Sequence, residues 1–162
     1  MTEQHIEHGT SSTDMSRKHY LMFGLNLLAS TVVMYFVMFT MIWSYDEFFN
    51  NLNMFYMALM MATPMGVLML LMMGSMYSNR RLNAELCAVF VVAFALSFFA
   101  MRDQAVVGDQ QFLRSMIPHH SGAILMCERA HLHDPEIRSL CAGIVEGQRQ
   151  EIEQMKRILA RT

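Results

Sequence analysis

Soft metal ligands are concentrated in one short segment of the last third of the chain. Thioether, imidazole and thiol side chains occur together there: Met116, His119, His120, Met126 and Cys127. Thioether and thiolate sulfur prefer Cu(I) and imidazole suits copper or zinc, whereas the hard oxygen ligands that calcium and magnesium prefer are missing from these positions. The residue types therefore predict a copper site, with Cu(I) favoured and with imidazoles that also tolerate Cu(II).

Two helices are expected to position these ligands. The first runs from Asp109, its expected N-cap, to about His131, and Asp134-Pro135 marks the break before a second helix that ends near Ala160. Apolar residues of the second helix keep mostly to steps of three and four, which gives it one buried face. The two segments therefore form an antiparallel helical hairpin. Because two helices rarely bury enough surface alone, we expect the hairpin to pair with a second copy into a four-helix bundle.

Helical spacing divides the ligands of the first helix between two stripes. At about 100° per residue, His119 and Met126 share one stripe, and His120 and Cys127 share the neighbouring stripe, which continues to His131. Seven residues rise roughly 10 Å along a helix, so His119 and Met126 cannot easily share one ion. More than one metal position is therefore expected.

Folding the hairpin about Asp134 brings sulfur ligands of the second helix level with those of the first. Two clusters are predicted in this way: Met116, His119, His120 and Met155 in the first, and Met126, Cys127 and Cys141 in the second. A methionine on an apolar face also commonly fills a core, so Met155 is equally explained as packing.

Two further groups of residues have alternative interpretations. Cys127 and Cys141 are level enough for a disulfide, but they also fit buried small residues or thiolate ligands. Glu128 and His131 form a Glu-x-x-His pair, the element from which ferritin-like di-iron sites are built. Glu128 points about 180° away from His119, however, and the facing level of the second helix carries no carboxylate. No catalytic triad or phosphate-binding loop is visible, so we do not expect an enzyme.

The pattern in this last third of the chain resembles the bacterial family of domain of unknown function 305. The residues that carry the resemblance are Asp109, Phe112, the Met116–His120 run, Gly122-Ala123, Met126, Gln150-Glu151-Ile152 and Met155. The resemblance implies a ferritin-like helical fold that binds copper outside the cytoplasm. The family's ligands, carried over by position, are His119, His120, Met126 and Met155, with Met116 as an addition. The chain departs from the family at Cys127 and Cys141, where small residues are usual, and in having one hairpin where many members have two.

The rest of the chain has the composition of a membrane protein. It has 162 residues, of which 54% are hydrophobic. Charged residues avoid three runs, at about 20–43, 54–77 and 82–101, each long enough to cross roughly 30 Å of hydrocarbon. The sequence therefore predicts a polar leader over residues 1–19, a three-span region over residues 20–101, and a helical-hairpin domain over residues 102–162.

The distribution of basic residues predicts the orientation. Arg17-Lys18 precedes the first span and Arg80-Arg81 separates the second from the third, whereas the loop from Ser44 to Asn53 has no lysine or arginine. Short cytoplasmic loops carry the excess of positive charge, so the leader is expected inside and the hairpin outside. These features predict a multi-pass protein of the bacterial inner membrane with a periplasmic copper domain. The formal net charge of −2 and the lack of a clustered basic face exclude a nucleic-acid partner.

These observations predict a membrane-anchored copper-binding protein for storage, buffering or delivery, with a copper-accepting protein as its partner. Methionines also recur at steps of three and four in the second span: Met54, Met57, Met61, Met65, Met69, Met72 and Met76. The stripe suggests a Cu(I) conduit as an alternative, although flexible apolar side chains are common in helix packing. A further alternative is a docking or assembly subunit of a membrane complex that binds no metal.

Overall fold

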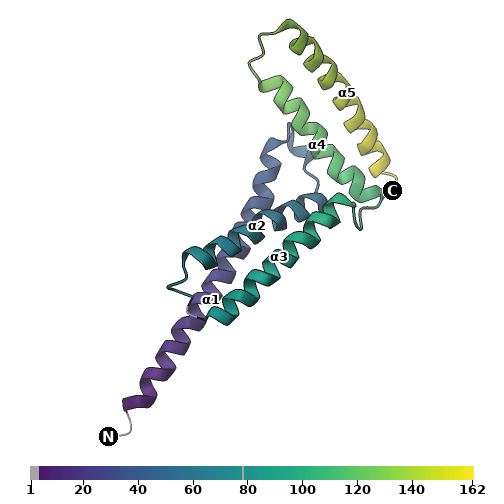
Figure 1. Cartoon of the computed structure of the whole chain (residues 1–162). Helices are drawn as coiled ribbons and strands as arrows, with labels where there is room; N and C mark the ends of the chain where they lie inside the picture. Colours follow the sequence, from purple (N-terminus) through teal and green to yellow (C-terminus); the bar gives the residue numbers. More distant parts are fainter. Residues whose placement is uncertain (1–3, 78) are drawn as a thin grey trace. The chain divides into compact units, whose positions relative to one another are not determined.

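The described part of the chain is entirely helical, which confirms the predicted all-α class. The computed structural model describes residues 4–77 and 79–162, and the side chains of residues 15–77 and 79–162. The elements in chain order are α1 (Gln4–Val37), η1 (Met38–Met41), η2 (Tyr45–Glu47), α2 (Leu52–Met72), α3 (Arg80–Arg102), α4 (Asp109–Arg129) and α5 (Pro135–Leu159), with α marking α-helices and η marking 3-10 helices (Figure 1). Residues 1–3 and the side chains of residues 4–14, which belong to the predicted leader, lie outside the described part.

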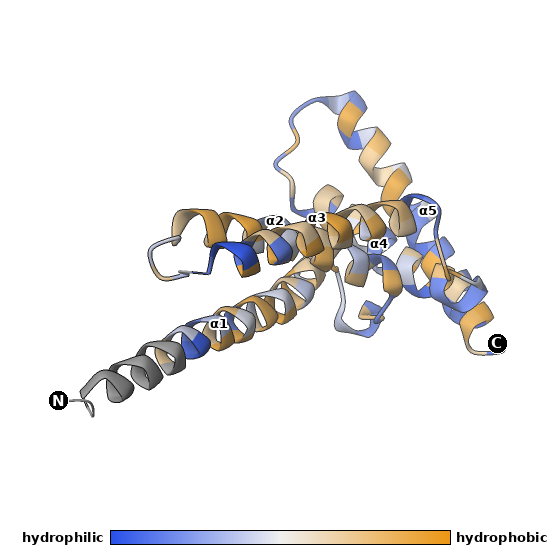
Figure 2. Ribbon diagram, turned by 60° about the horizontal axis from the view of Figure 1, so that its bottom comes forward, coloured by the Kyte–Doolittle hydropathy of each residue, from blue (hydrophilic) through white to orange (hydrophobic). Residues whose placement is uncertain are grey.

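Three helical segments are long and apolar enough to cross a membrane, as the sequence predicts. They are Met15–Met41, Leu52–Met72 and Arg80–Arg102. Hydrophobic residues run along these helices in Figure 2. The ends of the first two differ from prediction. The α-helix of the first span gives way to η1, and Ile42 is extended, so the helix does not continue to Trp43. The second helix stops at Met72, and the following residues form a turn in which the amides of Met76 and Tyr77 both donate to the carbonyl of Met73.

Contacts divide the chain into two compact units. The first contains residues up to Met34 together with Tyr56–Ala100. Its buried residues include Phe23, Leu70 and Tyr77, and at the same end of the unit the Tyr20 hydroxyl donates to Asn83 Oδ1 over 2.7 Å. Here Tyr77 is buried, and its ring packs against that of Tyr20.

Most of the buried residues of α2 are small. Ala58, Ala62 and Gly66 follow one another at four-residue steps, a spacing that allows close helix approach in membranes. Of the predicted methionine stripe, Met61, Met72 and Met76 are exposed, whereas Met69 is half-buried and packs against the cluster of Phe23, Leu70 and Tyr77.

The second unit contains Tyr35–Phe55 and Met101–Thr162. Its core joins the two helices of the predicted hairpin through Leu113, Ile117, Ile124, Ile152 and Met155. Helices α4 and α5 lie side by side, joined by a short loop (Figure 1). The loop between the first two spans packs within this same unit.

The starts of the hairpin helices are capped differently. Asp134 caps α5 as predicted, since its carboxylate accepts from the amides of Glu136 at 2.8 Å and Ile137 at 3.1 Å. The predicted N-cap of α4 is wrong: Gly108 occupies that position and Asp109 is the first helical residue. There its negative charge still complements the positive end of the helix dipole.

Candidate metal site

His120 is the candidate ligand that is held most firmly. Its Nδ1 lies 2.9 Å from the carbonyl oxygen of Met116, and its Nε2 lies 2.9 Å from Oε2 of Glu151 on α5. A carbonyl oxygen only accepts, so Nδ1 must carry the hydrogen of the first contact. This hydrogen bond fixes the orientation of the ring and directs Nε2 toward α5. The side chain is only 12% exposed.

His119 and Met126 lie on the open side of the same helix. Both side chains are exposed, and 60% of Met126 is accessible to solvent. The ring centroids of His119 and His120 are 6.1 Å apart. The imidazole of His119 is therefore available to an ion from solution, whereas that of His120 is held between the helices.

The two remaining methionine candidates meet in the core of the hairpin. Met155 is 9% exposed and belongs to the buried cluster, and Met116 is half-buried against that cluster. Folding about Asp134 was expected to bring these two residues to a common level, and they do share one cluster. The thioether of Met155 fills the core here, which agrees with the interpretation of this residue as a packing residue.

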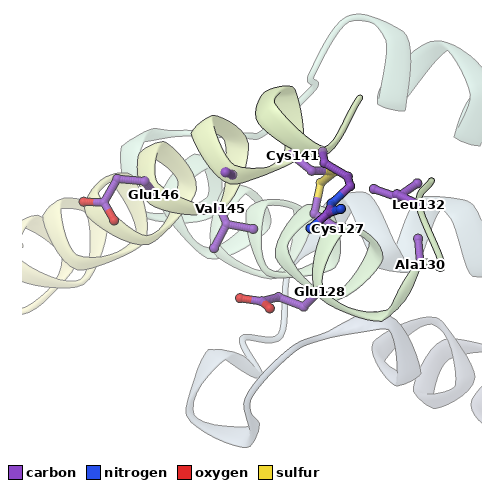
Figure 3. A pocket seen from close by; sticks show the side chains of 9 residues that line it. Cys127, Glu128, Ala130, Leu132, Cys141, Val145 and Glu146 are labelled. Carbon is purple, nitrogen blue, oxygen red and sulfur yellow. A yellow bond between two sulfur atoms is a disulfide. The ribbon is translucent and has the colours of Figure 1, made fainter. Parts of the chain in front are cut away.

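The cysteine candidates are joined to each other. Cys127 and Cys141 form a disulfide that links α4 to α5, with their Cα atoms 5.3 Å apart (Figure 3). The assignment of these two residues as thiolate ligands is therefore wrong for this state, because a disulfide has no thiolate to offer a metal. Of the three interpretations of the pair, the structure contains the disulfide.

The surroundings of the disulfide do not form a di-iron site. A cavity of about 420 Å³ borders the disulfide and includes Glu128 and Glu146 in its lining. Glu128 pairs with Arg149 across the hairpin at 2.9 Å, and His131 is exposed in the loop. Across the side chains of residues 15–77 and 79–162, no group of three or more His, Cys, Asp and Glu residues is close enough to hold an ion. Thioethers, water molecules or a second copy of the chain are further sources of ligands.

A buried polar contact fixes the segment before α2 to the ligand-bearing helix. The hydroxyl of Ser121 accepts a hydrogen bond from the Trp43 amide over 2.6 Å and donates to the carboxylate of Glu47. The same carboxylate oxygen accepts from the Ser44 amide over 3.3 Å. Ser121 directly follows the paired histidines, so this contact helps to fix the position of His119 and His120 relative to the loop.

Two small features support the same packing. A Cβ atom at Gly122 would lie 3.5 Å from the carbonyl oxygen of Met41, so η1 closely approaches α4 there. Pro118 leaves the Arg114 carbonyl without its helical amide donor, and the buried side chain of Asn51 donates to this carbonyl at 3.5 Å. The helix continues through Pro118.

Charged contacts at the surface join the same elements. Lys156 of α5 pairs with Asp46 of η2, and the guanidinium of Arg129 lies 5.5 Å from the ring centre of Trp43. The hydrogen bond from Lys156 lowers the pKa of Asp46 below its usual value, and the hydrogen bond from Ser44 lowers it further by a smaller amount.

Sequence reasoning did not identify Ser121, Glu47 or Glu151 as residues that position the site. Glu47 and Ser121 are 74 residues apart, and no local pattern connects them. For Glu151 a signal did exist, because the same folding about Asp134 that aligns Met155 with Met116 also brings the preceding turn of α5 to His120.

Comparisons with known proteins place the candidate ligands inside a shared segment. The family described as domain of unknown function 305 matches residues 95–159. The uncharacterized protein L153 of Acanthamoeba polyphaga mimivirus is 34% identical over 111 residues, which are 67% of this chain and 71% of that protein. The aligned stretch contains more residues than the chain has from residue 95 to its end. The similarity to this viral protein therefore begins before residue 95 and includes part of the membrane-spanning region. No solved structure matches the chain.

Proposed function

The chain belongs to the family of domain of unknown function 305, and on this premise we propose that it is a membrane-anchored protein that binds copper for storage, buffering or delivery. The bound ion is mainly Cu(I), and the hairpin binds it on the outer face of a bacterial inner membrane. Copper is a cargo, and no bond of a substrate is made or broken.

One observation carries this proposal. The imidazole of His119 and the thioether of Met126 are both exposed on α4, within the segment that the family matches. Sulfur and imidazole are ligands that Cu(I) prefers, and exposed ligands exchange readily with those of another protein. The copper binding implied by the family resemblance points to the same residues.

The chemistry that follows is ligand exchange. Thioethers carry no charge and require no deprotonation, so they hold Cu(I) without competing with protons. An imidazole binds a metal only when it is neutral, so acid should weaken the contribution of the histidines. A site built from both types can receive copper and release it to an acceptor protein that offers stronger ligands.

The distribution of charge supports the outward orientation. The basic pairs Arg17-Lys18 and Arg80-Arg81 belong to the first unit, whereas the hairpin and the loop from Ser44 to Asn53, which has acidic but no basic residues, belong to the second. Because lysine and arginine are retained on the cytoplasmic side, this separation favours an external hairpin.

The hairpin also has surfaces that suit a second copy. Large apolar residues are exposed on both helices: Phe112, Met126, Ile137 and Leu140. A groove of about 430 Å³ on α5 is lined partly by Gly143 and Gly147, and Cβ atoms at these glycines would meet nothing within 4 Å. Pairing of two hairpins into a four-helix bundle would cover the apolar residues Phe112, Ile137 and Leu140 and add ligands from the partner. Light scattering of the protein in detergent, corrected for bound detergent, would give its oligomeric state.

An anaerobic Cu(I) competition titration against a chromogenic chelator tests the proposal. The full chain in detergent is compared with a His119→Ala/His120→Ala variant, and a His131→Ala/His133→Ala variant serves as the control because it removes the same number of imidazoles from the loop. We expect tight binding in the wild type and in the control, and a loss of at least tenfold in the α4 variant.

Two results would count against the proposal. Absence of Cu(I) binding in the wild type would contradict copper handling and favour the docking-subunit alternative. Equal affinity in all three proteins would show that the paired histidines are not ligands and would transfer the proposal to the methionines.

A further inference from the structure

We propose that Glu151 is a metal ligand and that it forms, together with His120, a nitrogen–oxygen site for Cu(II). This inference rests on the proposed copper function and assigns a place to the oxidised ion, which the sulfur ligands hold poorly. The site joins α4 to α5, since the two residues come from opposite helices of the hairpin.

The distance between the two donor atoms fits a shared ion. Nε2 of His120 and Oε2 of Glu151 are 2.9 Å apart. Imidazole nitrogen and carboxylate oxygen bind ions such as zinc at about 2.0–2.1 Å, and two such ligands at a right angle lie about 2.9 Å from each other. Right angles between neighbouring ligands are the geometry of square-planar Cu(II) sites. An ion can therefore replace the direct contact with little movement of either helix.

The other nitrogen of His120 already has the partner that metal-bound histidines usually have. Nδ1 donates to the carbonyl oxygen of Met116, and such a hydrogen bond from the non-ligating nitrogen orients the ring and selects its tautomer. The hydrogen bond to the helix backbone fixes the imidazole ring, so that Nε2 points at the carboxylate of Glu151.

The carboxylate is accessible from solution. The side chain of Glu151 is 55% exposed, and it also accepts a 3.5 Å hydrogen bond from Gln148. It also borders the groove that contains Gly143 and Gly147. Because these glycines have no side chains, the groove leaves room for the water molecules that complete the coordination of the ion.

The ligand types determine which oxidation state is bound. Imidazole and carboxylate are harder ligands than thioether, and sites of nitrogen and oxygen donors favour Cu(II) over the soft Cu(I) ion. Among the divalent ions of the first transition row, such sites also bind Cu(II) most strongly. The hairpin would therefore bind the two states of copper at different residues, with Cu(I) at the methionines and His119.

Cu(II) titration of the full chain in detergent, followed by electron paramagnetic resonance, tests this site. Glu151→Gln keeps the size of the side chain but removes the anionic oxygen ligand. Glu153→Gln is the matched control, since that carboxylate lies two residues away and approaches Lys156 at 3.9 Å. We expect Glu151→Gln to weaken Cu(II) binding by 10- to 100-fold and to change the copper hyperfine splitting. The Cu(I) affinity of Glu151→Gln and the Cu(II) affinity of Glu153→Gln should both stay within twofold of wild type.

The result that overturns the inference is a Glu151→Gln protein with wild-type Cu(II) affinity and spectrum. Glu151 would then be a structural partner of His120 only. A wild type that binds Cu(I) but not Cu(II) also overturns it and leaves the proposed function standing, whereas a wild type that binds neither ion removes both. Circular dichroism of each variant verifies that a lost affinity does not reflect unfolding.

Discussion

The carboxylate of Glu47 accepts a hydrogen bond from the hydroxyl of Ser121, and both side chains are buried. Glu47 belongs to the loop between the first two spans, and Ser121 belongs to the helix that carries the candidate ligands. A buried carboxylate is stable only when its oxygens have donors, so this contact specifies how the loop packs on α4.

Ser121→Ala should destabilise the second unit by about 1–3 kcal/mol, because it removes one of the donors to a buried carboxylate and the hydroxyl that accepts from the Trp43 amide. Trp43 is the single tryptophan of the chain, so its fluorescence during denaturation reports on this loop. Ser115→Ala is the control, since that hydroxyl donates to the Phe112 carbonyl within the same helix. Equal effects of the two substitutions would show that the contact with Glu47 is not important for stability.

The ion pair of Asp46 with Lys156 predicts a pH-dependent contribution to stability. Hydrogen bonding from Lys156 lowers the pKa of Asp46 in the folded state. The contribution is therefore fully present above the unfolded pKa of about 3.9 and is lost as the pH falls through the lower folded pKa. Because the carboxylate is 64% exposed, solvent screening limits the contribution to about 1 kcal/mol or less. Asp46→Asn should lower the melting temperature at pH 6 but not at pH 2.5; an equal loss at both values would contradict the ion pair as its cause.

Removal of the disulfide should affect stability and leave copper binding intact. Cys127 and Cys141 are 14 residues apart, and closing a loop of about this length contributes about 3 kcal/mol in the chain-entropy account. The double variant Cys127→Ala/Cys141→Ala should lower the free energy of unfolding by about 2–3 kcal/mol, measured by denaturant titration. Its Cu(I) affinity should stay within twofold of wild type. A large loss of affinity in a folded variant would restore the thiolate-ligand interpretation.

Gly66 should not tolerate a side chain. A Cβ atom there would lie 2.8 Å from Cε2 of Phe90 on α3, which is too close for van der Waals contact. We expect Gly66→Ala to destabilise the packing of α2 on α3 by about 1–3 kcal/mol, as measured by denaturation in lipid nanodiscs. Gly24→Ala provides the comparison, because a Cβ at Gly24 would meet no heavy atom within 4 Å. If both variants were as stable as wild type, Phe90 would have moved aside.

Features that depend on neighbouring residues could be predicted from the sequence. Three apolar runs gave three helices of membrane-spanning length, and Asp134-Pro135 gave the start of α5. The helical period also separated His120, which faces α5, from the exposed His119 and Met126. These results follow because apolar length, capping and a repeat of 3.6 residues are local properties of a helix.

Features that require residues far apart in the chain to meet became clear only from the folded structure. It ended the first helix before Trp43, whose amide bonds to Ser121, and it joined Cys127 to Cys141. It also brought Glu151 to His120. Whether a cysteine is a ligand or half of a disulfide, and whether a glutamate faces solvent or a histidine, depends on which partner the fold supplies, and a pattern within one helix carries no information on that partner.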